Sequence, residues 1–337
     1  ITYQVELGVV NSTQSAITFT IAPDGGTTTL GSDHTDFTPP LIPLLPTLIS
    51  VAPGSSTGTY ELVVTDDTLF ENKETIAAKI SDASDTAILI ATASATADLF
   101  DNDNGVGTIN ADLSVTTNGA EGGAGITYTV TLAKTNNTHG SIFIDIARFG
   151  GTATVTDDYI DFASSNVEIA DGEISADITL TVVDDALFEN QENLEAIISS
   201  PSDTAIAINT ARALATIDDN DNTSIDAELA LTDPGAEGGD PLLYTLTLAK
   251  VNNTGVPITF SLAAAGTATT ADVENFNFST QEISVANNSS TGTLSLPITD
   301  DSLFENTETV EVTVSSPSDT AINIVTATAS GNITDND

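Results

Sequence analysis

An acidic segment with the pattern Asp-Asp-x-x-x-Glu-x-x-Glu occurs three times along the chain, beginning at Asp66, Asp184 and Asp300. Two carboxylates about 4 Å apart repel each other by roughly 4 kcal/mol at an effective dielectric constant near 20, so such clusters need a counter-charge. The chain has 49 Asp and Glu residues against 6 Lys and Arg residues, which leaves a formal net charge of −43. A bound cation is therefore expected. Carboxylate oxygens in a chain with no cysteine and two histidines favour Ca²⁺, which takes about 6–8 oxygen ligands.

The alternative interpretation is a solvated acidic coat, such as salt-adapted proteins carry. A coat gives no reason for acids to recur in register, whereas three copies of one spacing indicate a defined site. The wider composition excludes other kinds of site. Without cysteine the chain forms no disulfide, zinc–thiolate site or iron–sulfur cluster.

Two further markers recur in the same order and indicate tandem domains. Asp-Asn-Asp begins at Asp101, Asp219 and Asp335, and Ser-Asp-Thr-Ala-Ile begins at Ser84, Ser202 and Ser318. Repeats of this length are expected to be separate structural units. We therefore expect three domains, at residues 1–107, 108–223 and 224–337.

Within a repeat the hydrophobic pattern predicts β-strands. Apolar and polar residues alternate, with many Thr, Val and Ile, in Ile126–Leu132, Ile142–Ile146, Ser175–Val183 and Asn193–Ile198. Gly-Gly, Asn-Asn and Pro-Ser-Asp turns separate these stretches, and no helical period is sustained. The expected fold is all-β, with three tandem antiparallel two-sheet sandwiches of immunoglobulin size. Because the linkers are short, we expect the sandwiches to lie end to end.

The first repeat is shorter at its start than the other two. The marker Gly-Ala-Glu-Gly-Gly occurs only at Gly119–Gly123 and Gly235–Gly239. Ile1-Thr2-Tyr3 matches the Ile-Thr-Tyr at 126–128, just after that marker, so repeat 1 lacks its opening strand and glycine turn. Either the array continues upstream, or a neighbouring molecule donates the missing strand to the open edge.

Together these markers resemble the Calx-beta domain, and the resemblance covers the whole chain as three modules. It implies a seven-stranded sandwich with several Ca²⁺ ions at the end where its C-terminus leaves. The ligands that it implies are Glu121, Asp158, Asp184, Asp185, Glu189, Glu192, Asp218, Asp219 and Asp221 in the second repeat, and Glu237, Asp300, Asp301, Glu305, Glu308, Asp335 and Asp337 in the third. The corresponding segments of the first repeat offer Asp33, Asp66, Asp67, Glu71, Glu74, Asp101 and Asp103.

Two departures from that pattern affect the expected ligand sets. The first repeat has no counterpart of Glu121, so its cluster is expected to hold fewer ions. In the third repeat, Glu274-Asn275 stands where the second has Asp158-Tyr159, which puts that ligand in question.

The expected function is structural. Ca²⁺ at the C-terminal end of each module would stiffen the junction with the next, in an extracellular adhesin stalk or surface filament that is not an enzyme. The alternative is a Ca²⁺-sensing binding module whose inter-domain angle responds to ion occupancy. A surface this acidic repels phosphate groups, and no apolar stretch is long enough to span a bilayer, so we expect neither nucleic-acid binding nor membrane insertion.

Four smaller features complete the sequence-based expectations. The first repeat carries an apolar, proline-rich insertion, Pro39–Leu48, which is either a contact patch for other copies or a loop folded over its own sandwich. The lone histidines, His34 and His139, are expected in surface loops. One phenylalanine in each acidic segment is expected to fill the core beneath it; these are Phe70, Phe188 and Phe304. Sequons at Asn11, Asn136 and Asn252 permit glycosylation.

Overall fold

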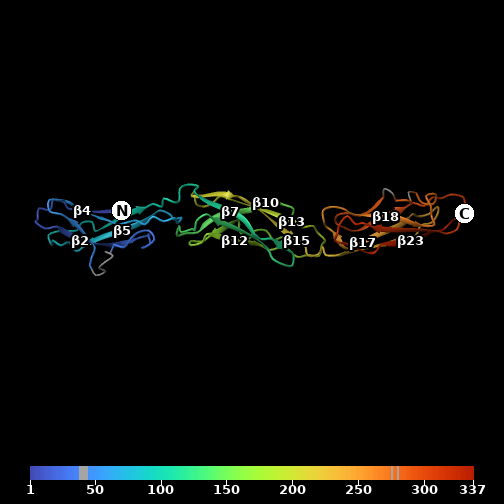
Figure 1. Ribbon diagram of the computed structural model, residues 1–337, viewed down its shortest axis with the longest axis horizontal. Coiled ribbons are helices and arrows are strands. Elements are labelled where there is room, and N and C mark those ends of the chain that lie inside the picture. Colours follow the sequence, from blue (N-terminus) through green and yellow to red (C-terminus); the bar gives the residue numbers. More distant parts are fainter. Residues whose placement is uncertain (38–44, 275, 279–280) are drawn as a thin grey trace.

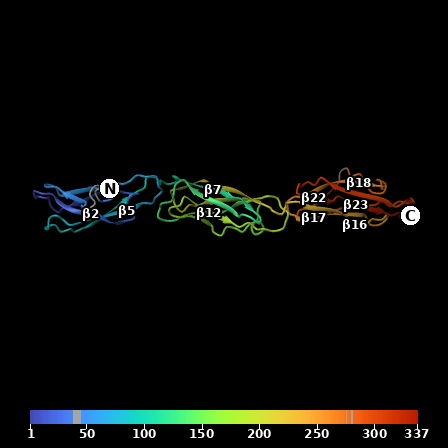
Figure 2. The same cartoon turned by 60° about the horizontal axis from the view of Figure 1, so that its bottom comes forward.

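Three β-sandwiches follow one another along a narrow rod in the computed structural model, which describes residues 1–37, 45–274, 276–278 and 281–337 (Figure 1; Figure 2). Every regular element in these ranges is a strand. The described residues form no helix of the length and apolarity needed to cross a membrane. The all-β prediction is therefore confirmed.

The second sandwich, repeat 2, contains the complete set of strands. Its strands are β7 (Ile109–Thr117), β8 (Gly119–Ala120), β9 (Ile126–Leu132), β10 (Ile142–Gly151), β11 (Asn166–Ile169), β12 (Ser175–Leu180), β13 (Glu192–Ser199), β14 (Ile206–Thr210) and β15 (Arg212–Asp218). One sheet has the order β12-β9-β7-β14 and the other β11-β10-β13-β15-β8. Each stretch predicted as a strand lies in one of these elements, although the one predicted to reach Val183 ends at Leu180.

The pairing is antiparallel except at the edge where the two ends of the domain meet. There β7 pairs with β14, and β8 with β15, in parallel. The segment that forms β7 and β8 passes from one sheet to the other, and so does the segment that forms β14 and β15. The two segments therefore run side by side in both sheets. Alternation within a strand says nothing about pairing between ends of a domain, which is why the sequence predicted a wholly antiparallel sandwich.

Repeat 3 reproduces this arrangement without a separate short strand. Its strands are β16 (Ile225–Asp233), β17 (Leu242–Asn252), β18 (Ile258–Gly266), β19 (Glu282–Val285), β20 (Ser289–Leu296), β21 (Glu308–Ser315), β22 (Ile322–Thr326) and β23 (Thr328–Ile333). They form two four-stranded sheets, β20-β17-β16-β22 and β19-β18-β21-β23. Strand β16 pairs in parallel with β22, as β7 does with β14.

Repeat 1 is incomplete on one side. Its described strands are β1 (Thr2–Glu6), β2 (Ile17–Gly26), β3 (Leu48–Val51), β4 (Thr57–Glu61), β5 (Glu74–Ser81) and β6 (Ser94–Leu99). One sheet is complete, in the order β3-β2-β5-β6, whereas the other contains only β1 and β4. The described part of repeat 1 has no counterpart of β7 or β14.

One tyrosine in each repeat ties its two sheets together. These tyrosines sit at the same place in β1, β9 and β17, and each is buried. A buried hydroxyl without a partner is costly, so it donates a hydrogen bond to the opposite sheet. Tyr3, Tyr128 and Tyr244 donate to the carbonyls of Ile76, Leu194 and Val310, over 2.9, 2.6 and 2.9 Å.

The predicted apolar insertion is described only in part. Residues 38–44 of Pro39–Leu48 lie outside the described residues. The remainder leads into β3, where the Leu48 side chain is exposed. Its contact role stays a prediction.

Candidate metal centres at the repeat junctions

Three loops meet at the C-terminal end of each sandwich, and one aspartate joins two of them. In repeat 2 the Asp219 carboxylate accepts the main-chain N–H of Glu189, in the loop before β13, over 2.9 Å. The same carboxylate accepts the N–H of Asp221 over 2.6 Å. Asp101 and Asp335 make the equivalent pairs of bonds in repeats 1 and 3. The Asp-Asn-Asp marker is thus partly a structural brace for the acidic loop.

Beside this aspartate, every repeat contains a group of three carboxylates, which we call the first triad. In repeat 2 it consists of Asp158, Glu189 and Glu192, with one oxygen of each lying within 4.8 Å of the others. Asp158 is held in place through its carbonyl, which accepts the N–H of Val183 over 2.9 Å. The equivalent triads are Asp33, Glu71 and Glu74 in repeat 1, and Asp272, Glu305 and Glu308 in repeat 3.

Repeats 2 and 3 contain a second triad beside the first. It comprises Glu121, Asp219 and Asp221 in repeat 2, and Glu237, Asp301 and Asp337 in repeat 3. The glutamate comes from the glycine turn that follows the first strand. Repeat 1 lacks that turn, and its described residues form one such triad. The smaller number of ions expected in repeat 1 stays a prediction.

In repeat 3 the structure gives a different counterpart of Asp158 from the one that the sequence comparison gave. Asp272, not Glu274, is the counterpart of Asp158, because its carbonyl accepts the N–H of Thr299 over 2.9 Å as Asp158 accepts that of Val183. Glu274 is exposed. Phe276 lies four residues after Asp272, as Phe162 lies four residues after Asp158. The spacing Asp-x-x-x-Phe, common to all three repeats, could have identified Asp272.

The remaining sequence-predicted acids lie around the triads. Asp66, Asp184 and Asp300 are exposed and accept side-chain hydrogen bonds from Asn102, Asn220 and Asn336. Asp67, Asp185 and Asp301 accept the N–H groups of Leu69, Leu187 and Leu303. Asp103 forms an ion pair with Lys134, and Asp221 with Lys250. Asp218 is exposed, accepts a hydrogen bond from Gln191 and is a member of neither triad of repeat 2.

Burial beside other carboxylates raises the pKa of several of these glutamates. Desolvation is the largest cause, followed by nearby aspartates, and the pKa is raised to about 7 for Glu71, Glu121 and Glu308. The pKa of Glu192 is raised to about 8 by desolvation and by contact with Asp158. Buried carboxylate oxygens of Glu74, Glu121 and Glu192 have no hydrogen-bond partner. These oxygens are therefore available to a ligand that brings positive charge.

The acidic loop also carries the contact between repeats. Phe70 and Phe188 were expected to fill the core beneath their own loop, but they pack into the core of the following repeat and are 0 % and 1 % exposed. Phe304, the equivalent residue of repeat 3, is 86 % exposed. The phenylalanine is therefore a contact to the next sandwich, and within residues 1–337 no sandwich follows repeat 3.

Main-chain and amide hydrogen bonds fix each phenylalanine in its socket. The carbonyl of Phe70 accepts the N–H of Asn137 over 2.9 Å, and that of Phe188 accepts the N–H of Asn253 over 2.8 Å. Two residues further on, Asn72 and Asn190 donate to the carbonyls of Thr138 and Thr254, over 3.1 and 2.9 Å. Glu189 of the first triad accepts a hydrogen bond from Asn253 of repeat 3. The junction therefore shares one segment of the chain with two of the metal-ligand candidates, Glu189 and Glu192.

The sequons at these sockets have a structural role that the sequence interpretation missed. Asn136 and Asn252 are fully buried, and their side-chain amides donate to main-chain carbonyls of the turn and of a neighbouring strand. Asn11 makes the same bonds in repeat 1. A glycan cannot attach to these amides in the folded chain. Asn-x-Thr begins two residues after both Lys134 and Lys250, and this recurrence could have indicated the structural role from the sequence.

The two histidines differ from each other. His34 was expected at the surface but is 6 % exposed, because it takes the place that Tyr159 and Val273 take in the other repeats. Its Nδ1 lies 2.8 Å from the carbonyl oxygen of Thr35. His139 is largely exposed, and its Nδ1 lies 3.7 Å from Glu74 of the first triad across the junction.

Comparison with known proteins identifies the repeats. The Calx-beta domain matches residues 3–103, 114–221 and 246–337. Among curated proteins, none matches the chain. Similar solved structures include CBD12 from CALX1.2, at 16% identity over 66% of this chain and 99% of that one, with a TM-score of 0.29. The Escherichia coli adhesin FdeC is 13% identical over 99% of this chain and 96% of that one (TM-score 0.27), and the Yersinia pseudotuberculosis adhesin InvE is 14% identical over 67% and 59% (TM-score 0.27).

The raised glutamate pKa values predict how stability depends on pH when divalent cations are removed. Between their ordinary pKa of 4.5 and about 7, Glu71, Glu121 and Glu308 bind more protons in the folded chain than in the unfolded chain. The free energy of unfolding therefore falls as pH rises through this window. Thermal unfolding in chelator across that range measures the effect. With saturating Ca²⁺ the fall should disappear, and a melting temperature that rises with pH in chelator would contradict these pKa shifts.

The buried phenylalanine predicts that neighbouring repeats stabilise each other. Phe188→Ala removes a side chain from the core of repeat 3 and should lower the free energy of unfolding of that repeat by about 3 kcal/mol. Phe304→Ala is the matched control, because the same residue in the same loop is exposed there. It should change stability by no more than about 0.5 kcal/mol. Calorimetric unfolding of both variants tests the contact, and equal effects would refute it.

Proposed function

The chain belongs to the Calx-beta family, and on that premise we propose that it is a Ca²⁺-stiffened structural array of an extracellular adhesin stalk or surface filament. We take residues 1–107, 108–223 and 224–337 as its three units. The observation that carries the proposal is the position of the triads of repeats 1 and 2. The first triad of each takes its two glutamates from the acidic segment whose phenylalanine packs into the next sandwich. A cation held there acts on the junction.

The residues present fit Ca²⁺. The donor set consists of carboxylate oxygens, several of them buried and without hydrogen-bond partners. Ca²⁺ prefers many oxygen ligands in flexible geometry, whereas Mg²⁺ requires a tighter octahedron and keeps more of its water. The first site of repeat 2 would use Asp158, Glu189 and Glu192, and the second would use Glu121, Asp219 and Asp221. The bound ion supplies the positive charge that the chain itself lacks.

The acidic loop connects Ca²⁺ binding to the stiffness of the junction between two sandwiches. Without a cation, repulsion among its carboxylates favours a more open loop, and this loop positions Phe188 and Asn190 for their contacts with repeat 3. With the cation bound, the loop is fixed and so is the angle between the two sandwiches. This role needs no catalytic group, and we propose none.

An extracellular location suits sites of this type. Extracellular modules bind Ca²⁺ with dissociation constants of about 10⁻⁴–10⁻³ M, and sensors bind it at about 10⁻⁷–10⁻⁵ M. The titration midpoint therefore separates the stalk from the alternative, a Ca²⁺-sensing module whose inter-domain angle reports ion occupancy. Other copies of the chain are the partners that a filament would need.

The first test concerns the ligands. Asp158→Asn removes a charge from the first triad of repeat 2 and should weaken Ca²⁺ binding at that site by about tenfold or more. Asp145→Asn is the control, because Asp145 is an exposed aspartate in the middle of β10. Isothermal titration calorimetry measures both. If the two variants bind Ca²⁺ alike, Asp158 is not a ligand.

The second test concerns the junction. The chain contains no cysteine, so two engineered cysteines can be labelled uniquely. Spin labels at Ser114→Cys and Ser295→Cys, on exposed faces of repeats 2 and 3, report the distance between the two sandwiches. We expect a narrow distance distribution in Ca²⁺ and a broad one in chelator. The same width in both conditions would refute stiffening, even if Ca²⁺ binds.

A further inference from the structure

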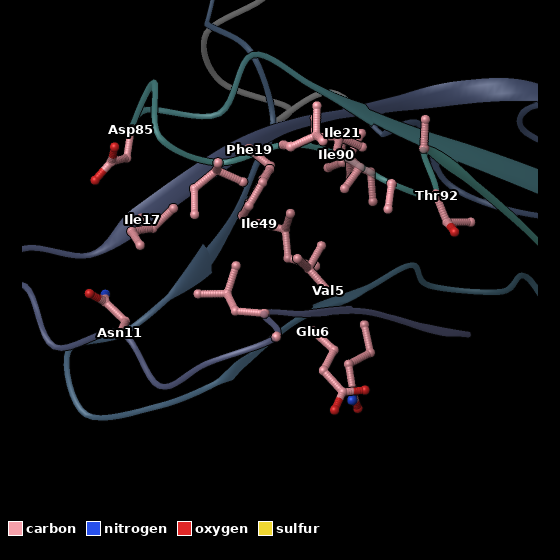
Figure 3. A pocket seen from close by; sticks show the side chains of 18 of the residues that line it. Val5, Glu6, Asn11, Ile17, Phe19, Ile21, Ile49, Asp85, Ile90 and Thr92 are labelled. Atoms are coloured by element: carbon pink, nitrogen blue, oxygen red, sulfur yellow. The ribbon is translucent and has the colours of Figure 1, made fainter.

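The cavity on the incomplete side of repeat 1 lies where repeat 2 has a strand. Figure 3 shows Val5, Phe19 and Ile49 around this space of about 600 Å³, which lies between β1 and residues 87–95. Strand β7 fills the equivalent space in repeat 2. We therefore assign no ligand to it, and both sources of a missing strand, the chain upstream and a neighbouring molecule, stay predictions.

The linker between repeats 1 and 2 contains a different feature, the dipeptide Asn104-Gly105. Asparagine is followed by glycine at two places in the chain, here and at Asn118-Gly119. In such a dipeptide the main-chain nitrogen of the glycine can attack the side-chain carbonyl carbon of the asparagine, because glycine has no Cβ to obstruct the approach. The two dipeptides share this reactive pattern, so their surroundings decide whether each one reacts.

The structure holds Asn118-Gly119 in an unreactive arrangement. Gly119 is buried in β8, where it pairs with Ile217 of β15. The Oδ1 atom of Asn118 accepts the main-chain N–H of Thr216, also in β15, over 3.1 Å. The asparagine side chain is therefore anchored to one strand and the glycine main chain is paired with the same strand. They cannot close onto each other without breaking the edge of the sheet.

Asn104-Gly105 lacks these restraints on the glycine. Gly105 is exposed and lies outside every strand, and its N–H donates no hydrogen bond to any described residue. The Asn104 side chain is half-buried, and its Nδ2 donates a hydrogen bond to the main-chain carbonyl of Glu71. The asparagine is therefore positioned, while no hydrogen bond holds the glycine nitrogen away from its side chain.

We propose that Asn104 is a site of spontaneous deamidation, and that its conversion loosens the junction between repeats 1 and 2. The Gly105 nitrogen forms a bond with Cγ of Asn104 and gives up its proton, and Nδ2 takes up a proton and leaves as ammonia. Water then opens the resulting cyclic imide at either of its carbonyls. The product is aspartate, or isoaspartate, in which the main chain runs through the former side chain. Water is the co-reactant, and no oxidant or reductant is needed.

The junction uses the amide that this reaction removes. Asn104 donates to the carbonyl of Glu71, and Glu71 directly follows Phe70, which packs into the core of repeat 2. A carboxylate at position 104 cannot donate to that carbonyl, and it adds a negative charge beside Glu71 of the first triad. The equivalent linker between repeats 2 and 3 contains Asn222-Thr223, in which the β-branched side chain hinders the attack. The reaction is therefore confined to one junction.

Peptide mapping by mass spectrometry tests the site. After prolonged incubation of the 337-residue chain at mildly alkaline pH, we expect Asn104 to become a mixture of aspartate and isoaspartate, while Asn118 keeps its amide. Gly105→Thr reproduces the residue that follows Asn222 and should abolish the conversion. Its Cβ would lie 3.0 Å from the Cγ2 methyl of Thr108, a side-chain end that can rotate. If Asn104 keeps its amide, or if Asn118 is converted as fast, the assignment is wrong.

Hydrogen exchange tests the effect on the junction. The N–H of Asn137 donates to the carbonyl of Phe70, so its exchange rate reports whether Phe70 occupies the core of repeat 2. Asn104→Asp has the charge of the aspartate product and should speed exchange at Asn137 by about fivefold, the factor expected for one lost hydrogen bond. Exchange at the same rate as in the unmodified chain would refute the loosening.

The next junction supplies the matched control. The N–H of Asn253 reports on Phe188 as that of Asn137 does on Phe70. Asn222→Asp adds the same charge there, but among the described residues only Asn104 of this pair makes the hydrogen bond to the acidic segment. It should leave exchange at Asn253 unchanged. If it speeds that exchange as much as Asn104→Asp speeds exchange at Asn137, the lost amide is not the cause and our account of the loosening is wrong.

Discussion

Repulsion between carboxylates is the constraint on which the arrangement of each repeat end depends. With 49 acids and 6 basic residues, the chain cannot neutralise its acidic loops by ion pairs. The few lysines near these loops illustrate the limit, since Lys134 and Lys250 each pair with a single aspartate of the Asp-Asn-Asp marker. The remaining acids are ordered by main-chain N–H groups and are left facing one another. Such an end is stable when a proton or a cation occupies it.

The same loop couples this electrostatic problem to the packing between domains. Phe188 is inserted into the core of repeat 3, and Glu189, the next residue, belongs to the first triad of repeat 2. A change in the carboxylates therefore moves the residue adjacent to the junction anchor. This proximity explains why the buried asparagine of each socket recurs with the acidic pattern. Asn252 shapes the turn that receives Phe188, and Asn253 binds both its carbonyl and Glu189.

Much of this could be predicted from the sequence because each repeat provides an internal comparison. Strand β9 matches its predicted bounds, and the acids Glu189 and Glu192 meet as their spacing suggested. The predictions that failed concern contacts that hydrophobic periodicity does not encode. The position of Phe70 depends on a neighbouring domain, and the parallel pairing of β7 depends on the end of its own domain. Asp272 was missed because the loop that contains it differs by two residues in its alignment with repeat 2.

The parallel pairing of the first and last strands has a mechanical consequence for a rod of this kind. When tension is applied along the rod, β7 is pulled toward one end of repeat 2 and β14–β15 toward the other. Their hydrogen bonds are then loaded in shear and must break together, whereas bonds at the end of an antiparallel hairpin can open one at a time. Repeats 2 and 3 are built to resist stretching in this way. The strands described in repeat 1 form no such parallel pair.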